Sequence, residues 1–446
     1  MSRLSGHLAE TIRLAAPVVV TRAGILVMAA VDTAMLGRTD IDQVAFYGIG
    51  TAPFIVITIT GIGLLFGTLV LTSHAVGREQ REEAGPIWRR SLPYALLLGL
   101  FGFILCLFGE ELFVLTNQPP AIAAGGGGVV AILGLGVPGT LLFTTTAFFL
   151  EGMRRPVPAM IVMIAANGLN VVCNWLLIFG HGGFPALGAD GAAWATTLVR
   201  TAMAAMLIGY VWWMTDRERC AVRTPLGPGW WRRGRAHRRF GLASGASYGI
   251  ESVAFAAIGF FAGILGALPL AAYTVQHIVF AMVFMIALGI ASATSVRVGI
   301  AHGRRDWPNR AMAAWSGFGL VILVLGVIGG FFLVFPAPIA AIFTDNARLA
   351  AATAPLIAFA AFALIFDGGQ AVIANALRGA GETWAPTAIH IVSYFVVMIP
   401  AGWIFAFTLN HGALGLIGAI IVASAVSVTL LSIRFVAISR QKIKDP

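Results

Sequence analysis

The chain has 446 residues, of which 59% are hydrophobic and only 11% are charged, and its mean hydropathy is +0.89. Soluble domains carry about 25% charged residues, so this composition excludes a soluble fold and indicates a polytopic membrane protein. The formal charge of +10 follows from basic loops between apolar segments and does not indicate nucleic-acid binding.

Twelve apolar stretches follow one another along the chain, and each is long enough to cross a hydrocarbon core of about 30 Å as a helix. The expected spans are 14–36, 46–70, 91–109, 126–149, 159–179, 191–214, 241–265, 273–296, 311–335, 354–377, 385–408 and 413–436. A transmembrane barrel would instead show alternating segments of about ten residues. The sequence therefore predicts an all-α protein with twelve transmembrane helices.

The basic residues predict the orientation of these helices. All but four of the 29 lysines and arginines fall on one side, because Arg38 and Arg348 lie on the other side and Arg22 and Arg200 lie within spans. The positive-inside rule then places both termini in the cytoplasm of a cell whose inner membrane holds the protein, and we expect a bacterial inner membrane. Anionic lipid is the expected partner of the basic segment 215–240.

The chain contains two copies of one unit. The motif A-L-G-x-x-G-A begins at Ala186 and again at Ala413, 227 residues later, and the same offset relates Leu150 to Leu377. Six spans per copy leave both copies in the same orientation, an arrangement found in many transporters. We therefore expect two pseudo-symmetric six-helix lobes, 1–214 and 241–446, joined by a cytoplasmic linker at 215–240.

The fourth span is unusually rich in glycine. The run Gly125–Gly128 is followed by Gly134 and Gly136. These residues would make the helix easy to bend, although small residues also serve simply to let membrane helices pack closely.

Three carboxylates stand inside apolar stretches: Asp32, Glu251 and Asp367. A carboxylate in hydrocarbon is costly, so such a residue is a functional-site hypothesis, and we expect these three to couple transport to an ion. Glu251 and Asp367 are expected at matching depth, where they could share a proton or a sodium ion. The alternatives are an interfacial cap for Asp32 and satisfied structural acids for the pair, with partners among Ser247, Ser252, Gln370 and Asn375.

A second polar set is expected near Asp32. Asn170 and Asn174 are four residues apart and so face the same way on one helix. With Thr196 or Thr197 they could form a cation or proton site in the N-terminal lobe, or they could only hydrogen-bond helices together.

Other residues carry weaker hypotheses. Arg200 could pair with Asp32 or extend to the membrane surface. His74, His277 and His390 are more typical of core hydrogen bonding than of proton relay. Four residues could form an adaptable apolar wall for substrate or could equally face lipid: Phe54, Met282, Phe284 and Met285.

Enzyme and ATPase classes find no support. The phosphate-binding motif G-x-x-x-x-G-K-[ST] requires a lysine, and the only lysines are Lys442 and Lys444. No zinc-protease helix or nucleophile elbow occurs. The three scattered cysteines indicate neither a disulfide framework nor a structural metal site.

Several motifs together resemble the multidrug and toxic compound extrusion (MATE) family over essentially the whole chain. They are Pro17, the run Val31–Gly37, the span around Glu251, and the runs Asp367–Gln370 and Ala376–Gly381. The resemblance implies a twelve-helix antiporter that exports organic, mostly cationic compounds in exchange for sodium ions or protons and needs no cofactor or ATP. It also implies export by a monomer through alternating access. A flippase of lipid-linked oligosaccharide or another amphiphile is the alternative, because it has related architecture.

The resemblance also assigns roles by position. Asp32 corresponds to the acid of the family's first span and Pro17 to the proline about which that span bends in some members. Glu251 and Asp367 correspond to cation-binding acids of the NorM-type branch, whereas the run Val31–Gly37 is closer to the DinF-type branch, so both branches stay open. Asn174, where some relatives carry an aspartate, and Ala363, where some carry an aromatic residue, leave the choice between H+ and Na+ open.

Overall fold

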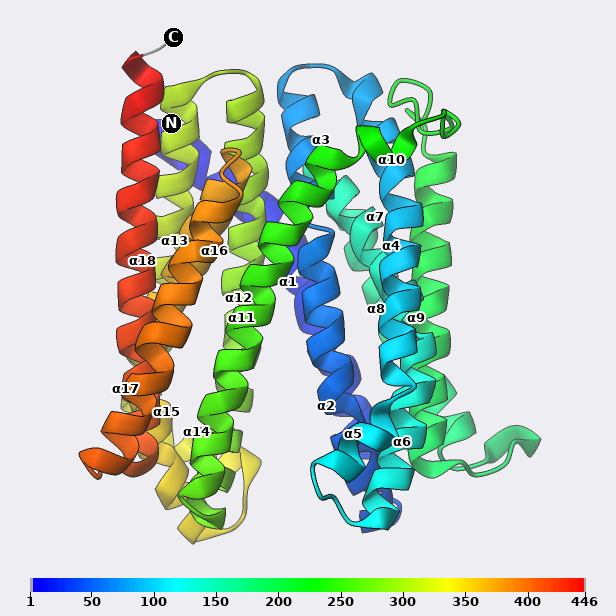
Figure 1. The fold of residues 1–446 in the computed structure, drawn as a ribbon, viewed down its shortest axis with the longest axis vertical. Coiled ribbons are helices and arrows are strands. Elements are labelled where there is room, and N and C mark those ends of the chain that lie inside the picture. Colours follow the sequence, from blue (N-terminus) through cyan, green and yellow to red (C-terminus); the bar gives the residue numbers. More distant parts are fainter. Residues whose placement is uncertain (1–2, 445–446) are drawn as a thin grey trace. The chain divides into compact units, whose positions relative to one another are not determined.

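The computed structural model describes residues 3–444, with side chains for residues 6–440. Arg3, Lys442 and Lys444, which entered the count of basic residues, therefore lie outside the described side chains. Every regular element in the described part of the chain is helical (Figure 1). The first half contains α1 (Arg3–Leu36), α2 (Ile41–Leu64), α3 (Gly67–Gly77), η1 (Arg81–Glu83), α4 (Ala84–Cys106), α5 (Gly109–Leu115), α6 (Pro120–Leu135), α7 (Val137–Gly152), α8 (Val157–Leu177), η2 (His181–Gly183), α9 (Gly188–Trp213) and α10 (Trp230–Arg233).

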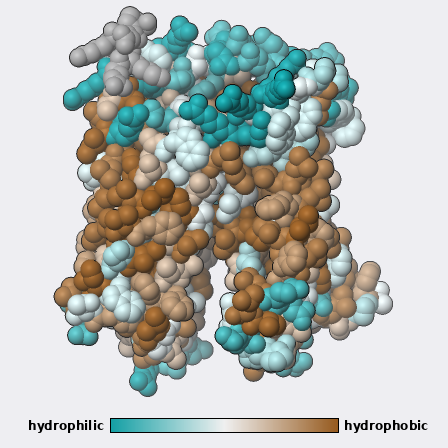
Figure 2. Space-filling model, viewed as in Figure 1, coloured by the Kyte–Doolittle hydropathy of each residue, from teal (hydrophilic) through white to brown (hydrophobic). Residues whose placement is uncertain are grey.

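The second half repeats this pattern with longer helices. It contains α11 (Arg235–Ile264), α12 (Ala267–Gly303), α13 (Trp307–Val334), α14 (Pro336–Phe343), α15 (Ala347–Gly379), α16 (Trp384–His390), η3 (Ile391–Met398), α17 (Ile399–Trp403), η4 (Ile404–Thr408) and α18 (Gly412–Lys444). The segments η3 and η4 are π-helical turns within the eleventh span. Figure 2 shows hydrophobic side chains along the lengths of the helices and hydrophilic ones gathered near their ends.

The expected number of spans is confirmed. Within residues 3–444, eleven helical segments are long and apolar enough to cross a membrane, and the pair α6 and α7, bent by 40°, supplies the twelfth. The break falls at Gly136, one of the glycines expected to permit bending, and Pro138 follows at the start of α7. A Cβ at Gly136 would lie 3.2 Å from Thr197 Cα, so the glycine serves close packing as well as the bend.

The helices pack into two compact units whose limits differ from the expected halves. One unit is Val20–Gly245, here called the N-terminal unit; the other, the C-terminal unit, is Met1–Val19 together with Ala246–Pro446. The first helix of each repeat thus changes unit partway along its length. The two changes fall 226 residues apart, close to the repeat offset found in the sequence.

Specific packing explains these limits. In the C-terminal unit, Leu14 and Ala15 of α1 are buried in one cluster with Ala287 and Ile290 of α12. In the N-terminal unit, the beginning of α11 lies beside α3 (Figure 1), where His237 Nε2 is 2.8 Å from Thr68 Oγ1.

The linker is tied to the N-terminal unit by polar contacts. Arg155 Nη1 lies 2.7 Å from Asp216 Oδ1, and the amide of Gly85 donates to the carbonyl of Cys220. Partial burial raises the pKa of Asp216, but the hydrogen bond and positive charge of Arg155 outweigh burial and lower it overall. The linker is therefore an ordered part of the unit, with exposed arginines at Arg219, Arg223, Arg232, Arg233, Arg235 and Arg239.

Candidate ion and substrate sites

The N-terminal unit gathers polar side chains around Asp32, which is only 1% exposed. Its Oδ1 accepts from the amide nitrogens of Asn170 (2.9 Å) and Asn174 (2.7 Å). Its Oδ2 accepts from the hydroxyls of Tyr47 (2.7 Å) and Thr196 (2.8 Å). A carboxylate buried in an apolar helix bundle must find donors there, and these four groups together satisfy both oxygens of Asp32.

The structure distinguishes the two threonines that the sequence left as alternatives. Thr196 reaches Asp32, whereas Thr197 donates instead to the carbonyl of Ile132, at 2.9 Å. Asn170 and Asn174 do share a face and are 3.3 Å apart through their side chains. Of the four residues expected around Asp32, Asn170, Asn174 and Thr196 are hydrogen-bonded to it, and Thr197 is not.

A cavity of about 160 Å³ opens beside this cluster within the N-terminal unit. Asp32, Tyr47 and Thr196 lie on its wall together with Phe54 and Arg200. The Arg200 guanidinium lies over the Phe54 ring at 4.6 Å, and its Nη1 donates to Thr140 Oγ1 at 3.2 Å. Arg200 therefore faces the same cavity as Asp32 and does not extend along the helix to the membrane surface.

The C-terminal unit brings together the two other predicted acids. Tyr394 Oη lies 3.3 Å from both Glu251 Oε1 and Asp367 Oδ1, so one phenol bridges the two carboxylates. Asp367 Oδ1 also accepts from Ser424 (3.0 Å) and Gln370 (3.3 Å). Glu251 is half-buried and Asp367 is 1% exposed. Two like charges held this closely repel each other when both are ionised, which favours binding of a cation or proton.

An arginine lies one helical turn from Glu251, beside Ser247 and Tyr248 of α11. Arg378 is buried, donates to Ser247 Oγ at 2.8 Å and lies over the Tyr248 ring at 5.2 Å. Ser247 is four residues before Glu251 on α11, and its hydroxyl is also 2.6 Å from His390 Nδ1. His390 is therefore a buried core hydrogen-bonding residue, and Arg378 provides a positive charge close to the acids.

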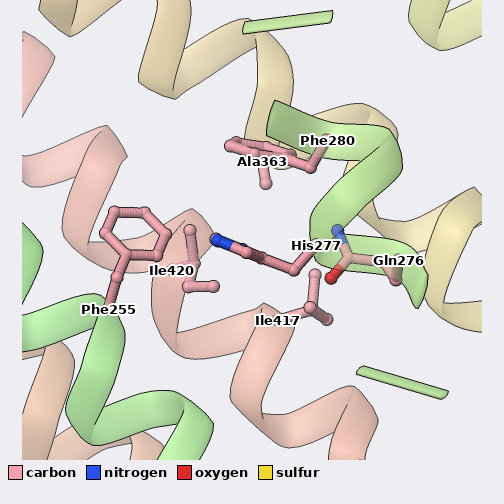
Figure 3. Close-up of a pocket in the computed structure, with 7 residues that line it drawn as sticks. All are labelled: Phe255, Gln276, His277, Phe280, Ala363, Ile417 and Ile420. Carbon is pink, nitrogen blue, oxygen red and sulfur yellow. The ribbon is translucent and has the colours of Figure 1, made fainter. Parts of the chain in front are cut away.

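A small pocket lies one turn from Asp367 on α15, at Ala363 (Figure 3). The ring of His277 stands in it, with its centroid 5.9 Å from that of Phe255 and 5.8 Å from that of Tyr273. Aromatic side chains of α11 and α12 therefore surround the position where α15 itself carries no aromatic residue. Gln276 also lines the pocket and is 3% exposed.

The remaining predicted residues are dispersed. Pro17 lies inside α1, two residues before the helix changes unit. Phe54 lines the cavity beside Asp32, whereas Met282 is 51% exposed. Phe284 and Met285 are half-buried, and the ring of Phe284 stacks on that of Phe280 at 5.9 Å. Of the expected apolar wall, Phe54 therefore lies in the cavity beside Asp32.

Sequence reasoning found Thr196 but missed the other hydroxyl donors of the two clusters. Tyr47, Tyr394 and Ser424 touch the predicted acids directly. Hydroxyl-bearing residues are common in membrane helices, so only the helix packing singles these out. Within the described residues, no group of three or more His, Cys, Asp or Glu side chains is arranged to hold a metal ion.

The fold and its repeats define a polytopic helical membrane protein of the transporter type. The family model MatE matches residues 17–176 and 244–404, and the chain belongs to this family, whose members are transporters and not enzymes.

Individual relatives match nearly end to end. A Caulobacter vibrioides protein named "Probable multidrug resistance protein NorM" is 37% identical over 96% of this chain and 91% of its own length. A protein of the same name from Mesorhizobium japonicum is 29% identical over 98% of this chain and 94% of its own. The crystal structure of the eukaryotic MATE transporter AtDTX14 has the same fold, with a TM-score of 0.90, 18% identity and 98% of each chain covered.

Proposed function

We propose that this chain is a secondary active multidrug efflux antiporter, which exports organic, mostly cationic compounds in exchange for H+ or Na+ by alternating access. Membership of a transporter family whose relatives carry multidrug-resistance names supports the efflux role. The observation that carries the exchange proposal is the carboxylate pair bridged by a phenol, Glu251–Tyr394–Asp367.

The cycle follows from charge. With both acids ionised, the pair attracts a cation, and binding of H+ or Na+ removes the repulsion between them. An ion-loaded unit and an ion-free unit then have different affinities for a cationic compound. This difference links transport of the ion to transport of the compound. Each species can shift the conformational equilibrium only by its differential affinity for the two states.

Asp32 has a separate part in the proposed cycle. Its four donors engage both oxygens, so a proton or cation that binds there would displace at least one of these bonds and loosen α1 from α2, α8 and α9. Proline removes one backbone hydrogen bond from a helix and permits a kink, so Pro17 is the proposed hinge. Asn170, Asn174 and Thr196 form the proposed N-terminal proton or cation site, and Thr197 supports the break at Gly136 instead.

We further propose a bacterial inner-membrane location with both termini in the cytoplasm, action as a monomer, and anionic lipid at the exposed arginines of the linker. Clusters of four to eight basic residues beside a membrane span are typical of anionic-lipid contact, each residue contributing about 1 kcal/mol.

The test is efflux of a fluorescent cation such as ethidium from cells, and uptake into everted vesicles, under separate proton and sodium gradients. Asp367→Asn and Glu251→Gln are expected to lower gradient-driven transport about tenfold or more, since hydrogen-bonded charged groups contribute about 1.5–3 kcal/mol. Asp32→Asn is expected to slow transport at either gradient. Full transport by all three variants would eliminate the exchange proposal, and the gradient that drives the wild type identifies the ion.

A flippase remains the alternative, and the charges support it less. A site for a pyrophosphate would be strongly cationic, whereas the cavity of the N-terminal unit balances one arginine against one aspartate.

A further inference from the structure

One ion pair of the N-terminal unit is separate from both acid clusters. Arg22 Nη2 of α1 lies 3.6 Å from Glu151 Oε1 of α7, and the side chains of the two residues are 16% and 3% exposed. The Arg22 guanidinium also lies over the Phe148 ring of α7, at 5.3 Å from its centroid. Charges with so little exposure are costly to separate, so this pair fastens α1 to α7 at one defined position.

The pair lies close to the proposed hinge of α1. Arg22 is five residues after Pro17 and ten before Asp32, so it stands between the hinge and the Asp32 cluster. At 1.5 Å per residue, Arg22 is about 7.5 Å from Pro17 along the axis, and a kink of about 20° would move it by about 2.5 Å. A movement of that size away from α7 breaks a contact that is now 3.6 Å long. The ion pair therefore opposes a bend at Pro17.

The internal repeat has a contact at the equivalent place in the C-terminal unit. The offset of 227 found in the sequence sets Glu151 opposite Arg378. The first helix of each repeat changes unit at points 226 residues apart, which sets Arg22 opposite Tyr248. Arg378 lies over the Tyr248 ring at 5.2 Å. The same two positions are thus in contact in both repeats, just after the first helix has entered the unit.

The chemistry of the two contacts differs. In the C-terminal unit Arg378 donates to Ser247 Oγ at 2.8 Å and stacks on Tyr248, and both of these partners on α11 are uncharged. In the N-terminal unit the partners are two opposite charges, Arg22 and Glu151. Separating opposite charges with little access to water costs more than separating an arginine from neutral groups. Buried ion pairs are best attested as devices that fix one arrangement or switch between two.

We propose that Arg22 and Glu151 are positioning residues for the exchange cycle. Their ion pair holds α1 packed against the N-terminal unit, and α1 bends at Pro17 when the pair separates. Both residues act through α1, because neither lines the cavity beside Asp32. The part in transport rests on the proposed function, whereas the hold on α1 is a property of the N-terminal unit alone. Ion binding at Asp32 and separation of the pair are then two requirements for one movement.

Spin labels measure the position of α1 without requiring transport. With the three native cysteines replaced by alanine, labels are attached at Ala34→Cys of α1 and Leu97→Cys of α4, two exposed positions of the N-terminal unit. Double electron–electron resonance on the full chain in lipid nanodiscs, across a pH series, gives the ratio of displaced to packed α1. Glu151→Gln and Arg22→Gln are each expected to raise this ratio about three- to tenfold, as for loss of a partly exposed ion pair.

Matched variants separate the ion pair from general effects on folding. The double variant Arg22→Gln with Glu151→Gln is expected to raise the ratio no further than one single variant, because each single change already removes the contact. Arg22→Lys is expected to give a smaller increase than Arg22→Gln, since it keeps the charge and loses the flat guanidinium. Arg78→Gln breaks the exposed pair with Glu83 in the same unit and is expected to leave the ratio unchanged.

The outcomes are distinct. One position of α1 in the wild type and in every variant would overturn the proposal, as would a lower melting temperature with an unchanged ratio. Displacement by Arg22→Lys or Arg78→Gln as large as that by Arg22→Gln would overturn it too. If a single variant fails to fold, the double variant, which removes both charges together, gives the decisive ratio. Efflux that ignores both ion gradients would instead refute the exchange cycle and leave the measured ratios of α1 as they are.

Discussion

The buried polar clusters of the two units differ in their balance of charge. In the N-terminal unit one acid, Asp32, shares a cavity with one base, Arg200. In the C-terminal unit two acids, Glu251 and Asp367, lie near one base, Arg378. With every group ionised, the first cluster is neutral and the second has one excess negative charge.

The hydrogen bonds to the acids also differ: Asp32 accepts more of them, and they are shorter, than Asp367. Asp32 accepts four hydrogen bonds of 2.7–2.9 Å shared between its two oxygens. The three donors to Asp367 all reach Oδ1, at 3.0–3.3 Å. A saturated carboxylate is already stabilised, whereas an undersaturated pair gains from an added cation. The comparison therefore favours the C-terminal cluster as the place where the coupling ion binds.

The largest effect on the difference between the two clusters is expected from removal of Arg378, the base of the C-terminal cluster. Arg378→Gln leaves two acids without a compensating charge, so we expect binding of the coupling cation to tighten about tenfold or more and the number of cations bound per protein to rise from about 1 toward 2, because the positive charge that competed with the cation is gone. Proton release from purified protein and isothermal titration with sodium measure both quantities.

Arg378→Lys is the control, because it keeps the charge. The double variant Glu251→Gln with Arg378→Gln restores one excess negative charge and is expected to return the number of bound cations to about 1. An unchanged ion count in the single Arg378→Gln variant would contradict the charge comparison.

A smaller effect is expected from the bridging phenol. Tyr394→Phe removes a donor that serves both acids, so the ionised pair loses stabilisation and binds the cation more tightly, by about three- to tenfold. The same titrations measure this change. Tyr47→Phe removes the corresponding hydroxyl from Asp32 and is expected to leave cation affinity unchanged within about twofold, so equal shifts in the two variants would remove the distinction between the clusters.

A further effect concerns the stability of the protein and compares neighbouring threonines of α9. Thr196→Val removes a hydrogen bond to a charged group and should lower the stability of the protein by about 1.5–3 kcal/mol, whereas Thr197→Val removes a bond to a carbonyl and should cost about 0.5–1.5 kcal/mol. Thermal unfolding followed by thiol-reactive dye or tryptophan fluorescence compares them. The reverse order would mean that Asp32 does not depend on its donors.

Some of this architecture was predictable from residue type alone. Spans follow from apolar length, and the glycines up to Gly136 indicated the bend of the fourth span. Acids inside apolar stretches pointed to the two clusters, and the spacing of Asn170 and Asn174 predicted a shared face that the structure contains. Each of these inferences depends on local sequence.

The rest required tertiary packing. Tyr47 and Tyr394 carry no signal in the sequence that marks them, and only the approach of separate helices makes them partners of Asp32 and of the Glu251–Asp367 pair. Likewise, the sequence left open whether Arg200 would lie near Asp32 or reach the membrane surface, because an arginine within a span can extend in either direction; the structure puts both residues on the wall of one cavity. Side-chain direction, unlike span length, is fixed by neighbours that are distant along the chain.

The passage of α1 and α11 from one unit to the other has a consequence for protein engineering. Residues 3–19 complete the fold of the second half, and residues 235–245 complete that of the first. A gene cut in the linker would therefore produce two fragments that each lack a helix end and carry a surplus one. Chimaeras with relatives should exchange segments after positions 19 and 245, where the chain passes from one compact unit to the other. They should not exchange them at the loop between the repeats.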